Sequence, residues 1–265
     1  MFKGKTIVIK YGGAAMESEE LKAGVMEDVC GLAEAGSAVV LVHGGGPELS
    51  LLQKRLGLET RFVDGLRYTD EETIGAALMA LCGKVNKDLV RLLQNAGGKA
   101  AGISGIDGGL LHCKKQREPD IGYVGEVEKV DTGLIRTLLR DGYIPVVSTI
   151  GLGNDGLAYN VNADTAAGKI AAALSADSYV TMSDIPGVLR DADDDESRIP
   201  EIRLDEVENL IEKGVISGGM IPKARGMADA VISGVGSAHL IDGRVPHVLR
   251  DWAEGSAAGT VFIGE

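Results

Sequence analysis

Few of the residues that build metal centres and disulfide frameworks occur in this chain of 265 residues. It has three cysteines, Cys30, Cys82 and Cys113, which are widely spaced and form neither a Cys-x-x-Cys pair nor a cluster with histidine. Such a scattered set indicates neither a disulfide scaffold nor a zinc site, and it is typical of a reducing compartment. We therefore expect a cytoplasmic protein with no metal ion bound by its own side chains.

Long basic runs and long apolar runs are also missing. With 27 lysines and arginines against 39 aspartates and glutamates, the formal net charge is −12, and the longest basic run is Lys114-Lys115. The chain therefore lacks the basic surface by which proteins bind nucleic acid, although lysines gathered in one cleft can still bind phosphate. The first apolar run, Ile7-Val8-Ile9, is too short for a secretory signal or a membrane span. We expect no nucleic-acid partner and no membrane association.

The glycine-rich turns at residues 12–13 and 44–46 match neither of the two most familiar nucleotide-binding motifs. The chain has no G-x-x-x-x-G-K-[ST] sequence, and neither turn fits G-x-G-x-x-G with an acidic residue about 20 positions later. Aromatic residues make up only 4% of a composition that is otherwise ordinary for a folded domain. Glycine is in excess, with 38 residues, roughly twice the ~7% average. Such an excess indicates many tight turns, or backbone that approaches a ligand closely.

Short β-branched runs alternate with segments of helical period, which is typical of α/β architecture with a mainly parallel sheet. The expected strands are Thr6–Lys10, Ala38–Val42, Ala100–Ile103, Ile144–Ser148, Ser178–Met182 and Ser237–Ile241. The expected helices cover about residues 18–35, 47–56, 70–96, 132–141, 163–175, 204–213, 219–234 and 245–253.

Three segments interrupt this alternation. Residues 108–131 and 151–161 show short polar and apolar alternation with glycine and aspartate, which predicts β-hairpins lying over the edge of the sheet. The acidic run from Asp191 to Ser197 is interpreted as a solvated loop. It lacks the glycine and glutamate positions of an EF-hand, so we do not expect it to bind a metal ion.

Two expected strands run directly into glycine-rich turns followed by helices. The first ends at Lys10 before Gly12-Gly13, and the second ends at His43 before Gly44-Gly45-Gly46. At the carboxyl ends of parallel strands, free amides at helix N-termini bind anions. One such turn is also explained by tight chain reversal alone, but two turns beside a lysine indicate a site for a phosphate that is being transferred.

Two further segments carry candidate site residues. Lys223 follows Gly218-Gly219 at the start of an expected helix, where an exposed helical lysine is the simpler interpretation. Asn162 is a plausible N-cap and Asp164 complements the helix dipole, so both also have a structural explanation. In an extended segment Asn160 and Asn162 share one side and can both face a ligand. An acid between two lysines would orient them and leave the site net positive.

Eight motifs in order along the chain resemble the amino acid kinase superfamily and, within it, the acetylglutamate kinases. With a closing Gly259-Thr260, the resemblance covers essentially the whole chain. The motifs are Lys10-Tyr11-Gly12-Gly13, His43-Gly44-Gly45-Gly46, Gly65-Leu66-Arg67, Gly83-Lys84-Val85-Asn86-Lys87, Gly105-Ile106-Asp107-Gly108, Val124-Gly125-Glu126-Val127, Asn160-Val161-Asn162-Ala163-Asp164 and Gly218-Gly219-Met220-Ile221-Pro222-Lys223.

The resemblance implies a three-layer α/β/α sandwich around a mainly parallel central sheet, formed by one domain over residues 1–265. A lobe of about residues 1–175 would bind the substrate, and a lobe of about residues 176–265 would bind the nucleotide. The implied reaction is transfer of the ATP γ-phosphoryl group to the side-chain carboxylate of N-acetyl-L-glutamate, a step in arginine biosynthesis. Mg²⁺ would be held mainly by the phosphates.

Matched motif by motif, the resemblance also implies roles for single residues. Lys10 and Lys223 would be the catalytic cations, oriented by Asp164. The residues that would contact the substrate are Gly45, Gly46, Arg67, Asn160 and Asn162, with Arg67 on the α-carboxylate. The residues that would border the nucleotide are Gly12, Gly13, Asp184, Ile185, Pro186, Gly187, Val188, Leu189, Val215, Ile216 and Ser217.

Other members of the superfamily leave two alternatives open. Aspartokinases and glutamate 5-kinases resemble K-F-G-G-T-S and G-S-S at the first turn, where this chain has Gly12-Gly13 followed by Ala14 and Ala15. A kinase acting on carrier-bound aminoadipate or glutamate in lysine synthesis shares more motifs, but the segment 160–164 is closer to the acetylglutamate kinases. The acidic net charge also suits an acidic carrier protein poorly. The second alternative is a catalytically silent amino-acid or nucleotide sensor.

The resemblance also bears on regulation. Arginine-inhibited relatives carry an N-terminal helical extension, whereas the first expected strand begins here at Thr6. We therefore expect an arginine-insensitive homodimer whose interface lies near the expected helix over residues 70–96. Ile106 stands where many relatives have lysine, so no role of charge is expected there.

Overall fold

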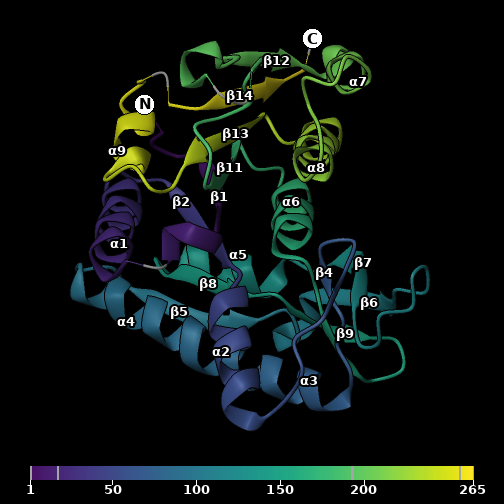
Figure 1. Ribbon diagram of the computed structural model, residues 1–265. Helices are drawn as coiled ribbons and strands as arrows, with labels where there is room; N and C mark the ends of the chain where they lie inside the picture. Colours follow the sequence, from purple (N-terminus) through teal and green to yellow (C-terminus); the bar gives the residue numbers. More distant parts are fainter. Residues whose placement is uncertain (1, 17, 192–193, 257, 265) are drawn as a thin grey trace.

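An eight-stranded sheet runs through the centre of the molecule (Figure 1). The computed structural model describes residues 2–16, 18–191, 194–256 and 258–264. The strand order is β12-β14-β13-β11-β1-β2-β8-β5, and all neighbours pair in parallel except β13 and β14. The strands are β1 (Thr6–Tyr11), β2 (Ala38–His43), β5 (Ala100–Ser104), β8 (Ile144–Ser148), β11 (Ser178–Ser183), β12 (Glu201–Arg203), β13 (Ser237–Asp242) and β14 (Thr260–Ile263).

All six expected strands of the sheet are confirmed, each within one residue at either end. Two strands beyond β13, β14 and then β12 at the edge of the sheet, were not predicted from the sequence. β12 has three residues and β14 has four. Strands this short carry too few alternating positions for a periodic signal, and only their neighbours place them in the sheet.

All eight expected helical regions are present, and the residues 70–96 fold as three consecutive segments. The segments are α3 (Glu71–Ala77), the π-helical η2 (Leu78–Val85) and α4 (Asn86–Asn95). The other helices are α1 (Glu19–Glu34), α2 (Gly46–Leu56), α5 (Gly133–Arg140), α6 (Ala163–Leu174), α7 (Val207–Glu212), α8 (Met220–Ile232) and α9 (Val248–Ala253). Side-chain caps fix several starts, such as Ser18 before α1, Asp70 before α3 and Asn162 before α6.

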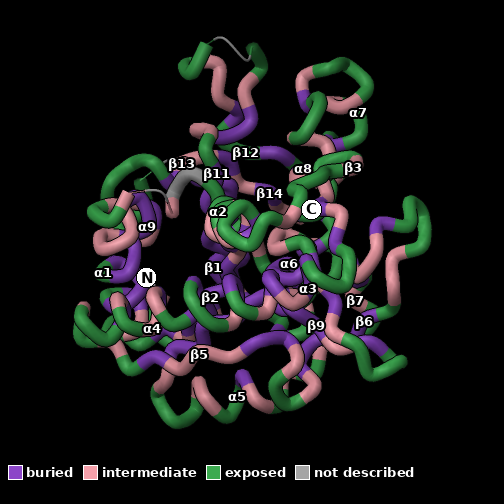
Figure 2. The backbone as a smooth tube through the Cα atoms, turned by 60° about the horizontal axis from the view of Figure 1, so that its bottom comes forward, coloured by how far each residue is buried: buried purple, intermediate pink, exposed green. Residues whose placement is uncertain are grey.

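Helices cover both faces of the sheet and give three layers. Val8 of β1 belongs to a core that includes Ile135 of α5, Ile170 of α6 and Met227 of α8. Successive residues of a strand point to opposite faces. Ile7 and Ile9 therefore lie in a second core formed with α1, α4 and α9. Figure 2 shows that the strands of the sheet are largely buried and that the outer faces of the helices are exposed. This arrangement confirms the α/β fold with its mainly parallel sheet.

The two expected hairpins are present, and they belong to a sheet of their own. β6 (Leu111–Lys115) pairs with β7 (Gly125–Val130), and β9 (Ile150–Gly153) pairs with β10 (Ala158–Asn160), all antiparallel. Parallel pairing of β6 with β9 joins them into a separate sheet of order β10-β9-β6-β7. The pairing of the two hairpins with each other was not predicted, because it is set by tertiary contacts between distant segments. A short hairpin of β3 (Phe62–Val63) and β4 (Leu66–Arg67) was not expected.

The acidic run from Asp191 to Ser197 lies partly outside the described residues, since 192 and 193 are not described. Its described part includes a short turn at Asp195–Ser197 and is mostly exposed. Within the described ranges, no three histidine, cysteine, aspartate or glutamate side chains are grouped so that they could hold a metal ion. No helix in those ranges is long and apolar enough to cross a bilayer.

Candidate functional site

The two glycine turns lie side by side where β1 and β2 end. The amide of Gly44 donates a hydrogen bond to the carbonyl of Tyr11 at 3.0 Å. A Cβ atom built on Gly12 would lie 3.5 Å from the Gly44 nitrogen, and one on Gly44 would lie 3.5 Å from the Ala163 Cβ. Because the turns and the start of α6 are this close, they form one continuous site at the carboxyl edge of the sheet.

Two lysines approach the same carboxylate in this site. The Lys10 Nζ atom on β1 lies 3.1 Å from Asp164 Oδ1, and the Lys223 Nζ atom on α8 lies 3.5 Å from Asp164 Oδ2. The Lys10 side chain is only 10% exposed, whereas that of Asp164 is 32% exposed. The structure thus brings together the three residues for which the sequence predicted a catalytic role.

The charges in this cluster are unbalanced. Burial alone would raise the pKa of Asp164, but the positive charges of Lys10 and Lys223 hold that pKa below its ordinary value. With the carboxylate ionised, two ammonium groups share one negative charge. The cluster therefore keeps one excess positive charge, which can attract an anion such as a phosphate group.

Helix N-termini add to the positive potential of the site. α2, α6 and α8 begin at Gly46, Ala163 and Met220, and the first amides of a helix have no acceptor within the helix. Among the described residues, no acceptor is recorded for the amides of Gly45 and Gly46. These amides are thus available to an anion beside Lys10.

Gly45 cannot be replaced by a larger residue without strain. Its φ is 152°, a value that other residues rarely adopt, and a Cβ atom there would lie 2.7 Å from Leu81 Cδ2. The π-helical segment η2 supplies Leu81 and also Val85, which a Cβ atom would approach to 3.0 Å. Glycine therefore lets the backbone run directly against this helix.

Arg67 is buried and binds only neutral partners among the described residues. Its Nη2 atom donates to the Gly46 carbonyl at 3.0 Å and to Ser50 Oγ at 2.8 Å, and its Nη1 atom donates to Gln53. Burial lowers the pKa of Arg67 from its ordinary value. A guanidinium stays charged even so, and a buried charge without an opposite partner favours binding of a carboxylate.

Thr69 connects Asn160 to the Arg67 segment. Asn160 Nδ2 donates to Thr69 Oγ1 at 3.4 Å, and that hydroxyl donates to the Arg67 carbonyl at 2.9 Å. Asn162 lies at the start of α6, is exposed, and accepts a hydrogen bond from the Thr165 amide at 3.0 Å. Asn160 and Arg67 are thus parts of one substructure, while the contacts of Asn162 are those of an N-cap.

Apart from Gly12 and Gly13 in the first glycine turn, the residues expected to border a nucleotide lie in two segments, one after β11 and one before α8. Asp184 to Leu189 follow β11, whose Tyr179 hydroxyl donates to the Asp164 carbonyl at 3.1 Å. Val215 to Ser217 lie between α7 and α8, where Ile216 is buried and Ser217 is exposed. The first segment thus adjoins the strand that contacts the Asp164 backbone, and the second precedes the helix that carries Lys223.

A buried threonine holds the first of these segments in place. Thr260 Oγ1 of β14 accepts from the Val188 amide at 2.9 Å and donates to the Ile199 carbonyl at 2.6 Å. Gly187 has φ 142°, and a Cβ atom there would lie 2.7 Å from the same Thr260 hydroxyl. The loop after β11 is thereby attached to β14, one of the two strands that were not predicted from the sequence.

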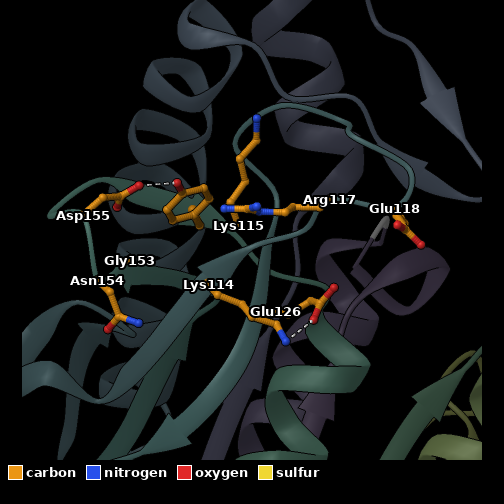
Figure 3. Close-up of a pocket in the computed structure, with 9 residues that line it drawn as sticks. Lys114, Lys115, Arg117, Glu118, Glu126, Gly153, Asn154 and Asp155 are labelled. Atoms are coloured by element: carbon orange, nitrogen blue, oxygen red, sulfur yellow. Dashed lines mark hydrogen bonds and ion pairs between the residues drawn. The ribbon is translucent and has the colours of Figure 1, made fainter.

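A cavity of about 500 Å³ lies on the four-stranded sheet, away from the predicted site residues. Figure 3 shows the Arg117 side chain reaching across the lining residues, and Lys114 pairs with Glu126 at 3.1 Å. A second cavity of about 340 Å³ includes Gly45 and, of the predicted site residues, no other.

Several residues around the site received no role from the sequence. Gln53 and Thr69 fix Arg67, Thr260 fixes the nucleotide segment, and His43 contacts the Gly44 carbonyl. His43 and Thr260 lie within or beside matched motifs, and this position was the one sequence signal that could have identified them as site residues. The other two are common polar residues in unremarkable positions.

Comparisons with known proteins agree with this geometry. The model of the amino acid kinase family matches residues 5–242. Acetylglutamate kinase of Clostridioides difficile is 48% identical over 99% of this chain and 92% of its own length. That of Heliobacterium modesticaldum is 51% identical over 94% of this chain and 88% of its own length.

Solved structures show the same fold at lower identity. Residues of this chain superpose on N-acetylglutamate synthase of Neisseria gonorrhoeae with a TM-score of 0.86 at 23% identity, covering 100% of this chain and 60% of that one. Carbamate kinase of Giardia lamblia gives a TM-score of 0.74 at 18% identity, with 100% of both chains covered. The lysine cluster at the strand ends and the full-length relatives point to the same family. The chain belongs to the amino acid kinase family and, within it, to the acetylglutamate kinases.

Proposed function

We propose that this protein transfers the γ-phosphoryl group of ATP to the side-chain carboxylate of N-acetyl-L-glutamate, which gives N-acetyl-L-glutamyl 5-phosphate and ADP in arginine biosynthesis. The observation that carries the proposal is the pair Lys10 and Lys223 on one carboxylate, beside free glycine amides. The full-length relatives named acetylglutamate kinase support the choice of acceptor.

The chemistry requires electrostatic help more than a base. The acceptor carboxylate is ionised near neutral pH, so no proton has to be removed before attack. A carboxylate oxygen forms a bond to the γ-phosphorus while the bond from that phosphorus to the β–γ bridging oxygen breaks, and ADP leaves. Both reactants are anionic, so Lys10, Lys223 and the Gly45 and Gly46 amides serve to offset their repulsion and the charge that develops.

In this proposal, Lys10 on the central strand faces the transferring phosphoryl group. Lys223 at the start of α8 faces the nucleotide phosphates. Asp164 holds both ammonium groups in place without cancelling their charge. Such fixed charges need no rearrangement during the reaction, which is why they stabilise the transition state more than mobile solvent does.

The acceptor would be held at its other end. Arg67 binds the α-carboxylate of acetylglutamate, because it is a buried cation whose described partners are neutral. Asn160 lies beside it through Thr69 and can bind the acetylamide or the carboxylate. Asn162, at the mouth of the site, completes the substrate contacts.

The nucleotide would lie against Gly12 and Gly13, the segment from Asp184 to Leu189, and the segment from Val215 to Ser217. Magnesium usually binds through substrate phosphates and water with few protein carboxylates. Asp164 is the described acid nearest the lysine pair, so the donors present fit an ion that is held mainly by ATP. Bound in this way, the ion would offset charge on the phosphates.

We also propose how the protein is divided into lobes, how two copies associate and where in the cell it acts. The substrate lobe of about residues 1–175 would end with α6, and the nucleotide lobe of about 176–265 would begin with β11. A homodimer would form near residues 70–96, where the Met79 side chain is 56% exposed. The protein would act in the cytoplasm, because its three cysteines are free and its small-molecule substrates are those of biosynthesis.

The test is formation of an acyl phosphate, trapped with hydroxylamine as a hydroxamate, in the presence of ATP and Mg²⁺. Acetylglutamate, glutamate, aspartate and acetylaminoadipate are compared as acceptors, together with a carrier-protein-linked substrate. A kcat/KM highest for free acetylglutamate is expected. Higher kcat/KM for the carrier-linked substrate would replace the proposal with the lysine-pathway kinase. No hydroxamate with any acceptor would favour a silent sensor.

A further inference from the structure

His43 is a buried histidine to which phosphoryl transfer assigns no task. It is the last residue of β2, its side chain is fully buried, and it immediately precedes the three glycines of the second turn. Its Nδ1 atom lies 2.7 Å from the Gly44 carbonyl oxygen, and its Nε2 atom lies 3.1 Å from Nδ2 of Asn86. Both ring nitrogens therefore have a partner.

These partners fix the tautomer. Burial lowers the pKa of His43 to about 4, opposed by the hydrogen bond to Gly44 and assisted by nearby Lys87. A neutral imidazole has one donor and one acceptor nitrogen. The Gly44 carbonyl can only accept, so Nδ1 carries the hydrogen. Nε2 then accepts from the Asn86 amide group.

Asn86 is itself held in one orientation. Its Nδ2 atom also donates to the Val146 carbonyl at 2.9 Å, and its Oδ1 atom accepts from Lys87 Nζ at 3.0 Å. Lys87 Nζ donates in turn to the Gly102 carbonyl at 3.1 Å. The hydrogen bonds thus run in one direction from Lys87 through Asn86 and His43 to the Gly44 carbonyl.

The Gly44 carbonyl and the Gly45 amide belong to the same peptide group. In a trans peptide the C=O and N–H bonds point in opposite directions. Because the C=O is drawn toward His43, the Gly45 N–H points away from it, and no acceptor for this amide is recorded among the described residues. Glycine residues on both sides of the peptide give it freedom to rotate, so it needs an external restraint.

We propose that His43 is a positioning residue that, with Asn86 behind it, holds the Gly44–Gly45 peptide so that the Gly45 amide stays directed at the transferring phosphoryl group. This inference rests on the proposed function, because it gives that amide its phosphoryl partner. Without the restraint the peptide can flip and present a carbonyl oxygen to an anion. Such a flip removes one hydrogen-bond donor and sets a carbonyl oxygen against the anionic phosphoryl group, which it repels. The flip would therefore raise the energy of the transition state more than that of the bound substrates.

Two substitutions of similar size separate this role from simple packing. Asparagine places its amide nitrogen near the position of Nδ1, so His43→Asn can keep the bond to the Gly44 carbonyl. Glutamine reaches the position of Nε2, so His43→Gln can keep the contact with Asn86 but loses the bond to Gly44. The unfolding midpoints of both variants are measured, so that loss of folded protein is separated from loss of rate.

We expect His43→Gln to lower kcat about 10- to 100-fold, the lower range for loss of one such donor, with KM for ATP and acetylglutamate changed less than about threefold. His43→Asn should keep kcat within about threefold of the wild type. Equal kcat values for two folded variants would overturn the proposal, as would a loss confined to KM.

A measurement on the unsubstituted protein keeps the proposal testable if the variants fail to fold. Nitrogen-15 NMR of histidine-labelled protein should show His43 protonated on Nδ1 and bare on Nε2 near neutral pH. Its signals are assigned through their disappearance in whichever variant folds, or through contacts to labelled Asn86. Protonation on Nε2 would overturn the proposal. A protein with the Nδ1 tautomer and no kinase activity would instead contradict the proposed function.

Discussion

The Lys10 ammonium group lies 3.1 Å from the Oδ1 atom of Asp164 and joins the end of the central strand to the first turn of α6. Lys223 reaches the other oxygen of the same carboxylate. The ion pair therefore sets the spacing of two positive groups, and it does so at a point where the backbone amides of two glycine turns are close. The four predictions below test this arrangement and its supports.

Loss of either lysine should slow the chemical step. Lys10→Ala and Lys223→Ala each remove one cation from the transition state, so kcat should fall at least about 10²–10³-fold. Steady-state kinetics measure this change. Lys169→Ala, an exposed lysine on α6, is the matched control and should keep its kcat. Near-normal kcat in either folded site variant would contradict the two-lysine mechanism.

Asp164 should stabilise the folded protein above acidic pH and not below it. Its pKa is lowered in the folded state, so its contribution is complete above the unfolded value of about 3.9 and disappears as the pH falls through the folded pKa. Asp164→Asn should therefore lower the unfolding free energy near neutral pH, with a difference from the wild type that shrinks below about pH 4.

Urea denaturation at a series of pH values measures that difference. Glu212→Gln, at an exposed position on α7, is the control and should show no comparable dependence on pH. A difference between wild type and Asp164→Asn that stays constant down to about pH 3 would argue against the lysine-stabilised carboxylate.

Arg67 should act on binding of the acceptor more than on the rate of transfer. Loss of a charged hydrogen-bonding partner costs roughly 1.5–3 kcal/mol, so Arg67→Ala should raise KM for acetylglutamate about 10- to 100-fold with kcat changed much less. Arg55→Ala, an exposed arginine on α2, should leave both constants near the wild-type values. A lower kcat with an unchanged KM would place Arg67 in another role.

Thr260 should matter for binding of ATP although it lies on β14, outside the segments expected to border the nucleotide. Thr260→Val leaves the Val188 amide and the Ile199 carbonyl without their partner. Unsatisfied buried groups cost about 1–3 kcal/mol each, so the loop after β11 should loosen and KM for ATP should rise several-fold. Thr260→Ser keeps the hydroxyl and should retain the wild-type KM. An unchanged KM in Thr260→Val would show that ATP does not depend on this attachment.

Local patterns determined most of the secondary structure. β-branched runs predicted six strands of the sheet, and helical periodicity predicted eight helical regions. Both signals are local, because the spacing of apolar residues along a short segment defines the face that is buried. Capping residues such as Asn162 marked helix starts correctly, since a cap acts only on the next turn. The short strands β12 and β14 carried no such signal.

The candidate site was predicted as a set of residues, and its geometry was not. The ordered motifs singled out Lys10, Asp164 and Lys223, but their spacing in the chain gives no distance between them. The neutral partners of Arg67 and the attachment of Val188 to Thr260 were likewise beyond the sequence. Each joins segments that are distant along the chain, and no local periodicity records such a contact.

The sequence by itself therefore determined the alternation of strands and helices, the glycine turns and the residues able to handle phosphate. Only the tertiary structure gave the distances of the two lysines from their shared carboxylate, and only it decided that hairpins from separate segments form their own sheet and that His43 contacts the peptide before Gly45. The physical reason is range. Backbone preference and periodicity act over a few residues, whereas charge pairing and burial depend on which distant segments pack together.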